Sequence, residues 1–115
     1  MISKSITIAR AEGTWVVRIA GAVIGESTAA LVLHEDNLED VIYFPREDVE
    51  MAFLDQSDLR TTCPAKGEAQ YYTVVAKSGP VVNAAWSYET PIEDVSRIAG
   101  HIAFHANDMV AVEQI

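Results

Sequence analysis

The chain has 115 residues, 50% of them hydrophobic, and a formal net charge of −9 at pH 7. Nucleic-acid phosphates and anionic membrane surfaces attract basic proteins, so this charge argues against both as partners. The length predicts a single domain covering residues 1–115, and no apolar segment approaches the ~20 residues that span a bilayer.

A single cysteine, Cys63, rules out an intrachain disulfide and an all-thiolate zinc site within one chain. The first residues, which include Ser5, Thr7 and Arg10, lack the long apolar block of a secretory signal peptide. Both observations predict a cytoplasmic protein in a reducing compartment.

Strand signals dominate the first forty residues. Residues 14–19 are rich in β-branched and aromatic side chains, and Gly21 supplies a turn into a second strand at 23–25. An apolar run at 29–34 is followed by an acidic loop at 35–40. This pattern is typical of β-structure with short connections.

The middle of the chain combines short elements with two expected loops. Residues 41–44 form a short apolar strand that ends at Pro45, because proline cannot donate a hydrogen bond to a β-ladder. Residues 45–48 are expected to form one helical turn, and 51–54 a strand or an extended segment. The first expected loop, at 43–48, includes the end of this strand and the helical turn. The second is expected at 61–67.

The last part of the chain returns to strand signals. Residues 69–76 alternate loosely between apolar and polar side chains, a turn at 78–80 follows, and the β pattern continues through 81–88. Two further strand-like segments lie at 102–104 and 109–112.

One short helix is predicted near residues 91–99. Thr90 offers a hydroxyl cap, Pro91 suits the first turn, and Glu93 lies three residues after the cap. Four apolar residues share one face of this helix: Ile92, Val95, Ile98 and Ala99. Gly100 stands where a left-handed terminator is expected. The whole pattern predicts a mainly β domain, an antiparallel sandwich or tent-like fold with one short helix.

Ordered residues over about half of the chain carry a family resemblance, which is more specific than an isolated motif. They are Tyr43-Phe44-Pro45-Arg46, Asp48-Val49, Leu54, Ser57, Thr61-Thr62-Cys63-Pro64, Lys66-Gly67, Ala69, Tyr71-Tyr72, Ala85-Trp86-Ser87-Tyr88, Pro91, Gly100 and Ala103-Phe104. On these residues the chain resembles family four hundred and twenty-seven of the bacterial domains of unknown function. The resemblance implies a compact, mostly β domain of the sandwich or two-sheet, tent-shaped type, and it implies no established activity.

Members of that family are sometimes labelled nucleotidyltransferase-like. Nucleotidyl transfer usually needs closely spaced carboxylates that hold metal ions, and a glycine-rich turn around the phosphates. Neither Gly25-Glu26-Ser27 nor the acidic loop at 35–40 matches these patterns. Fold-level similarity alone therefore assigns no reaction.

The candidate site lies on the two expected loops at 43–48 and 61–67, since binding groups concentrate on loops held by a rigid scaffold. A guanidinium, an ammonium and hydroxyl groups suit a carboxylate or phosphate ligand, and Lys66-Gly67 lets backbone amides approach an anion. We therefore predict a pocket for a small anionic molecule. Its expected ligand-binding residues are Tyr43, Arg46, Asp48, Thr61, Thr62, Lys66, Gly67, Trp86 and Tyr88.

Structural roles compete with this interpretation. Arg46 could pair with Asp48 or Glu68 as a clasp between segments, because structural ion pairs resemble functional ones. Trp86 and Tyr88 lie two residues apart, so on a strand they face the same side. With Tyr71 across the ladder they could wall the pocket or belong to the core.

Two other functions are compatible with the sequence. Cys63 could be the catalytic nucleophile of a redox or transfer enzyme, if Lys66 or Arg46 stabilised its thiolate, or it could be a packed thiol. Alternatively, the chain is a structural or protein-interaction domain without a pocket, and an open sheet edge would allow homo-oligomers.

The sequence indicates no metal site and no particular cofactor. His101 and His105 lie four residues apart and could meet His34 or Cys63 in the fold. Their spacing matches no recognised ligand motif, so incidental histidines are the preferred interpretation.

Overall fold

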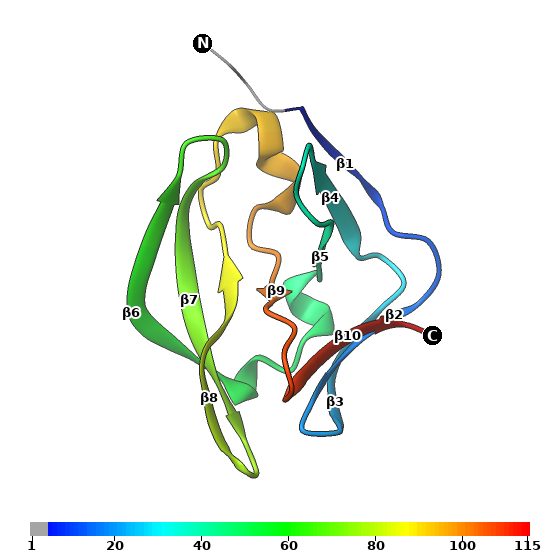
Figure 1. Ribbon diagram of the computed structural model, residues 1–115, viewed down its shortest axis with the longest axis vertical. Helices are drawn as coiled ribbons and strands as arrows, with labels where there is room; N and C mark the ends of the chain where they lie inside the picture. Colours follow the sequence, from blue (N-terminus) through cyan, green and yellow to red (C-terminus); the bar gives the residue numbers. More distant parts are fainter. Residues whose placement is uncertain (1–4) are drawn as a thin grey trace.

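A computed structural model describes residues 5–115, which form ten β-strands in three antiparallel sheets (Figure 1). The first sheet has the order β1 (Ile6–Arg10), β4 (Leu31–Glu35) and β5 (Val41–Tyr43). The second has the order β10 (Val110–Gln114), β2 (Trp15–Ile19) and β3 (Ala22–Ser27). The third has the order β6 (Leu54–Cys63), β7 (Gly67–Ala76), β8 (Gly79–Ser87) and β9 (Ala103–Phe104). The predicted mainly β, antiparallel domain is confirmed, with three small sheets in place of two.

The first and third sheets are joined through their backbones. The Phe44 N–H donates to the Ile102 carbonyl, and the Ile102 N–H donates to the Phe44 carbonyl, both over 2.8 Å. Phe44 follows β5 and Ile102 precedes β9, so this pair links the two sheets directly. Figure 1 shows the third sheet on one side of the molecule and the other two sheets opposite it.

Two hydrophobic clusters fill the interior. The first joins the second and third sheets through Val17, Ile19, Ile24, Phe44, Val49, Leu54, Tyr72, Val74, Ala84, Ala85, Ile102, Phe104 and Val110. The second joins the first and third sheets through Leu31, Leu33, Tyr43, Ala69, Tyr88, Val95, Ile98 and Ala103. Strand β7 contributes to both clusters, with Val74 in the first and Ala69 in the second. Burial of apolar surface in these clusters holds the three sheets together.

The short helical segments are all 3₁₀ turns: η1 (Arg46–Asp48), η2 (Met51–Phe53) and η3 (Glu93–Ile98). The helical turn predicted at 45–48 is therefore present as η1. The strand or extended segment predicted at 51–54 is wrong for residues 51–53, because the Phe53 N–H donates to the Glu50 carbonyl and closes a turn, whereas Leu54 begins β6. A short apolar run does not distinguish a strand from a helical turn.

A short helix occupies the predicted region near 91–99, but its details differ. Its N-cap is Ile92 without a side-chain cap bond, and non-helical dihedrals at Val95 interrupt it. Val95 and Ile98 are buried as the shared face predicts, whereas Ile92 and Ala99 are exposed. Gly100 has a φ of 72°, so the predicted left-handed residue after the helix is confirmed.

The expected loop at 61–67 is mostly strand, which corrects the prediction. Residues 61–63 end β6, Gly67 begins β7, and the turn between them is closed by the Lys66 N–H donating to the Cys63 carbonyl. Only Leu54 is buried along the whole of β6. An edge strand with so few buried side chains lacks the alternating hydrophobic pattern from which strands are recognised.

Across residues 5–115, none of the helical segments has the length and apolar character required to cross a bilayer.

Candidate functional site

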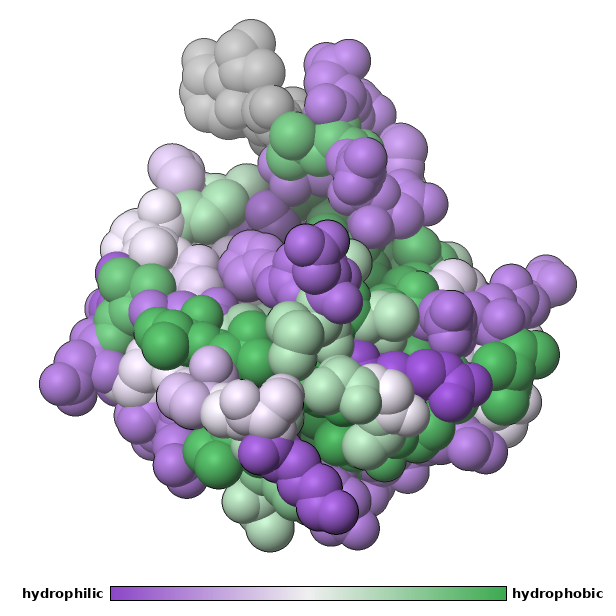
Figure 2. Space-filling view, turned by 60° about the horizontal axis from the view of Figure 1, so that its bottom comes forward, coloured by the Kyte–Doolittle hydropathy of each residue, from purple (hydrophilic) through white to green (hydrophobic). Residues whose placement is uncertain are grey.

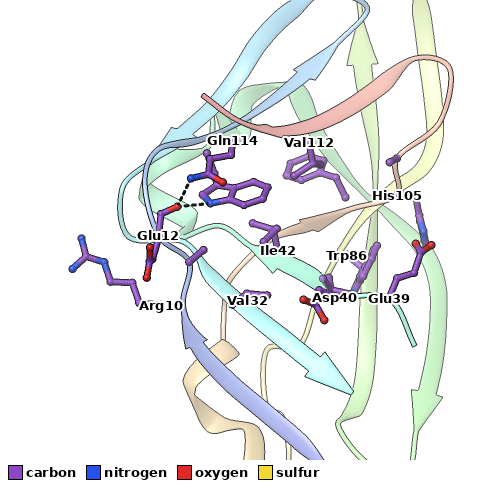
Figure 3. Close-up of a pocket in the computed structure, with 15 residues that line it drawn as sticks. Arg10, Glu12, Val32, Glu39, Asp40, Ile42, Trp86, His105, Val112 and Gln114 are labelled. Atoms are coloured by element: carbon purple, nitrogen blue, oxygen red, sulfur yellow. Dashed lines mark hydrogen bonds between the residues drawn. The ribbon is translucent and has the colours of Figure 1, made fainter. Parts of the chain in front are cut away.

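A cleft of about 770 Å³ opens where the three sheets meet (Figure 3). This volume falls in the range of ~300–1,000 Å³ that is typical of small-molecule pockets. Apolar side chains form its floor: Val32, Val41, Ile42, Phe104 and Val112. Aromatic side chains wall it: Trp15, Trp86 and His105. Polar side chains surround it: Arg10, Glu12, Glu39, Asp40 and Gln114.

One wall of the cleft is the indole of Trp15. Its Nε1 donates a hydrogen bond of 3.0 Å to the Glu12 carbonyl, and Gln114 Nε2 donates to the same carbonyl over 3.1 Å (Figure 3). Gly13 makes this arrangement possible, because its φ is 81° and a Cβ there would lie 2.6 Å from Gln114 Nε2. The indole is therefore held in place before any ligand arrives.

The opposite wall is the indole of Trp86. The His105 imidazole lies against it, with ring centroids 4.4 Å apart, and Tyr71 stacks on His105 at 6.4 Å. Trp86 Nε1 donates to the Tyr43 hydroxyl over 3.3 Å. The indole N–H is thus used inside the protein, which leaves the aromatic surface of Trp86 as its contribution to the cleft.

His34 and Asp40 form an ion pair at the rim. His34 Nδ1 lies 2.7 Å from an oxygen of Asp40, and Asp36 lies 3.8 Å from His34 Nε2. This hydrogen bond, with the charges of both carboxylates, raises the pKa of His34 above 6.5. The pKa of His105 is shifted the other way: burial disfavours the charged imidazolium and lowers its pKa below 6.5.

We expect an NMR titration to separate these two histidines, with the pKa of His34 above 6.5 and that of His105 below it. Asp40→Asn should bring the pKa of His34 toward 6.5 and leave the pKa of His105 unchanged.

The same shifts make stability depend on pH. The His34 contribution to stability is present below pH 6.5 and is lost as the pH rises through the raised pKa. The His105 contribution is present above pH 6.5 and is lost as the pH falls through the lowered pKa. If the pKa of His34 were the same in Asp40→Asn as in the unmodified protein, this assignment would be contradicted.

Arg46 belongs to a separate polar network. Its Nε donates to the Gly100 carbonyl over 3.1 Å, its Nη1 to the Tyr72 hydroxyl over 3.4 Å, and its Nη2 pairs with Glu89. Ser87 also donates to the Glu89 carboxylate. The clasp considered for Arg46 therefore exists, but its partner is Glu89 and not Asp48 or Glu68.

Lys66 forms a buried ion pair with Glu35. Its Nζ lies 2.8 Å from Glu35 Oε1, and the two side chains are only 12% and 7% exposed. Lys66 Nζ also lies 3.5 Å from Cys63 Sγ. Burial opposes the charged form of Lys66, but the bond to Glu35 and neighbouring negative charge keep its pKa above the ordinary value.

The tyrosines of the predicted site lie in the core near this pair. Tyr43 and Tyr88 are both buried in the second cluster. Burial raises the pKa of each hydroxyl, and the Lys66 charge partly offsets this for Tyr88. Trp86 and Tyr71 pack against the same cluster and pair across β7 and β8, as expected for Tyr71 across the ladder. Tyr88 follows the end of β8, so the strand spacing expected for Trp86 and Tyr88 does not extend to it.

The remaining predicted residues are dispersed. Asp48 accepts a hydrogen bond of 2.6 Å from Ser27, and Thr61 shares one of 3.0 Å with the Tyr71 hydroxyl. Thr62 is exposed, and Gly67 lies under the backbone of residues 90–92. Of the ten residues predicted from the sequence, Trp86 is the one that lines the cleft.

Residues 7–114 match the family described as a domain of unknown function, DUF427. The chain is a DUF427 domain. This confirms the resemblance seen in the sequence, and the match covers nearly all of the part that the structure describes. Comparison with curated proteins finds no match.

Most of the cleft of this DUF427 domain was missed from the sequence. Trp15, Ile42 and His105 come from separate segments and meet only through the pairing of the sheets. The one available signal was the two tryptophans, since amphipathic aromatics often wall ligand pockets. No group of three or more His, Cys, Asp or Glu side chains within residues 5–115 is arranged to hold a metal ion.

Proposed function

We propose that this DUF427 domain binds a small organic molecule in the cleft between Trp15 and Trp86. The observation that carries the proposal is the combination of volume, apolar floor and two aromatic walls in one recess. Pockets of this composition bind ligands by burying apolar surface, while a few polar groups set orientation. Because Trp15 is already fixed by its bond to Glu12, binding would lose little side-chain entropy.

The anionic-ligand pocket expected at 43–48 and 61–67 has weaker support. Arg46 is paired with Glu89, and Lys66 is paired with Glu35. An incoming anion would have to displace a carboxylate from each cation. We therefore place ligand binding in the cleft, and treat the two cations as structural.

Chemistry at Cys63 is the second candidate, favoured by one observation. The Lys66 ammonium lies 3.5 Å from Cys63 Sγ, and a neighbouring cation stabilises a thiolate. The same ammonium is shared with Glu35, which reduces its effect on the sulfur. Cys63 is partly exposed and lies outside the cleft, so this chemistry would use a different site.

A protein-interaction role is the third candidate. Several large apolar side chains are exposed, including Val82 at 69% and Phe53 at 46%. Figure 2 shows apolar groups reaching the surface in several places, with hydrophilic groups between them. Scattered exposed apolar residues are normal for a soluble domain, so the cleft remains the better-supported site.

The test uses the fact that Trp15 and Trp86 are the only two tryptophans in the chain. All tryptophan fluorescence therefore comes from the walls of the cleft. We expect a fragment library to contain compounds that shift this emission and also raise the melting temperature. At a hundred times its dissociation constant, such a compound adds about 2.7 kcal/mol of stability.

Two variants locate the binding. Trp15→Ala should weaken the binding of these compounds about tenfold or more, since it removes one aromatic wall. Val82→Ala is the matched control, because Val82 is exposed and lies outside the cleft lining. Circular dichroism checks that both variants are folded. Compounds that bound Trp15→Ala with unchanged affinity would place the ligand site elsewhere.

A further inference from the structure

The polar rim of the cleft is negatively charged on balance, and this bears on which ligands it admits. Three carboxylates, from Glu12, Glu39 and Asp40, surround the cleft, against one guanidinium from Arg10. Asp40 is paired with His34. Among the described residues, no ion pair involves Glu12 or Glu39. Two carboxylates thus have no cation of residues 5–115 within ion-pair distance.

Arg10 does not offset this charge inside the cleft. Its Nε and Nη2 both donate to the Thr28 carbonyl, over 3.2 and 2.8 Å. Figure 3 shows the Arg10 side chain extending away from the other residues that line the cleft. The guanidinium is therefore held at the outer edge, away from Glu39 and Asp40.

The aromatic walls favour the same sign of charge. The face of an indole ring attracts cations, and the attraction grows when the cation is shielded from water. The cleft contains two indoles, from Trp15 and Trp86. The imidazole of His105 lies against Trp86, and burial lowers its pKa, so it adds no positive charge near neutral pH.

The charge of the whole chain acts in the same direction. A formal net charge of −9 attracts cations over a distance and repels anions. Anionic ligands would meet this field and then the carboxylates of Glu12 and Glu39. Cationic ligands would be attracted by the field and could form ion pairs with the same carboxylates.

We infer that the cleft is selective for ligands in which a positively charged amine or alkylammonium group adjoins an aromatic or apolar group. The apolar part would lie on the floor at Ile42 and Val112, and the cation would lie between the indole faces and the carboxylate of Glu39. This inference rests on the proposed function, because it concerns the same cleft.

Three soluble probes of matched size test the inference: phenethylamine as the cation, 2-phenylethanol as the neutral analogue and phenylacetate as the anion. We expect phenethylamine to bind about tenfold more tightly than 2-phenylethanol, and phenylacetate to bind most weakly. Binding is measured by tryptophan fluorescence and by the chemical shifts of the two indole N–H groups. Added salt should reduce the preference, because the rim carboxylates are exposed.

Glu39→Gln should remove most of the difference between phenethylamine and 2-phenylethanol. Glu47→Gln is the matched control, because it makes the same change in net charge at an exposed residue outside the cleft lining. It should leave the preference nearly intact. A loss of preference in Glu39→Gln alone would support the inference and assign it to the rim and not to the overall charge.

Two outcomes would overturn the inference. If all three probes bound with equal affinity, or phenylacetate bound best, the cleft would bind small molecules without selecting cations, and the proposed function would stand. If none of the probes and no compound of the fragment library changed the signals of Trp15 and Trp86, the proposed function itself would fail.

Discussion

Glu35→Gln is expected to lower the free energy of unfolding by about 3 kcal/mol. The carboxylate of Glu35 and the ammonium of Lys66 are 2.8 Å apart, and both side chains are almost fully buried. A neutral amide at position 35 would leave the ammonium in the interior without an opposite charge. Removal of one partner of a buried ion pair typically costs ~3–5 kcal/mol for this reason. Equilibrium unfolding in urea measures the change.

The exposed ion pair between Arg18 and Glu113 is the matched control. Its length of 3.0 Å is similar, but its side chains are 39% and 51% exposed. Glu113→Gln should therefore change the stability by less than about 1 kcal/mol. The double variant Glu35→Gln with Lys66→Met should recover part of the loss, because no unpaired charge remains. Equal costs for Glu35→Gln and Glu113→Gln would show that burial does not decide the strength of these pairs.

The features that sequence reasoning predicted well are local. The strand at 14–19 is rich in β-branched and aromatic residues, and it forms β2 at nearly the same positions. Gly100 follows an apolar helical face and adopts the left-handed conformation expected there. The turn expected at 78–80 joins β7 to β8, and it brings Tyr71 and Trp86 opposite one another in the ladder. In each case residues near in sequence determine the structure.

The features that were missed depend on distant pairs. Arg46 and its partner Glu89 are 43 residues apart, and Lys66 and Glu35 are 31 residues apart. The carboxylate that a cation meets is decided by sheet pairing, which local patterns do not encode. Strand β6 was partly taken for a loop for the related reason that its exposed side chains carry no hydrophobic period.

The cleft shows the same limit most clearly. Its lining comes from β1, β2, β4, β5, β8, β9, β10 and the segments near them, so its residues are scattered from Arg10 to Gln114. A dense run of reactive residue types, such as 61–67, attracts attention in a sequence. In this fold that run contains Lys66 of a buried ion pair and the end of an edge strand. The cleft is built instead from single residues of several predicted strands, and the sequence does not show that these residues meet.

Phe44→Ala is expected to lower the free energy of unfolding by about 3–5 kcal/mol. Phe44 is fully buried, and its ring meets the ring of Phe104 edge-to-face, with centroids 6.0 Å apart. Its backbone exchanges two hydrogen bonds with Ile102, so the side chain packs where the first and third sheets join. Truncation would leave a cavity at this junction that the surrounding strands can fill only in part.

Phe53→Ala is the control for this prediction, because Phe53 is 46% exposed and its loss should cost less than about 1 kcal/mol. A double-mutant cycle with Phe104→Ala should give a coupling of ~0.5–1.5 kcal/mol for the aromatic pair. Phe104 also lines the cleft, so Phe44→Ala should loosen the floor and weaken ligand binding as well as stability. If Phe44→Ala cost no more than Phe53→Ala, the junction of the sheets would be held by the backbone pair with Ile102 and not by the packing of Phe44.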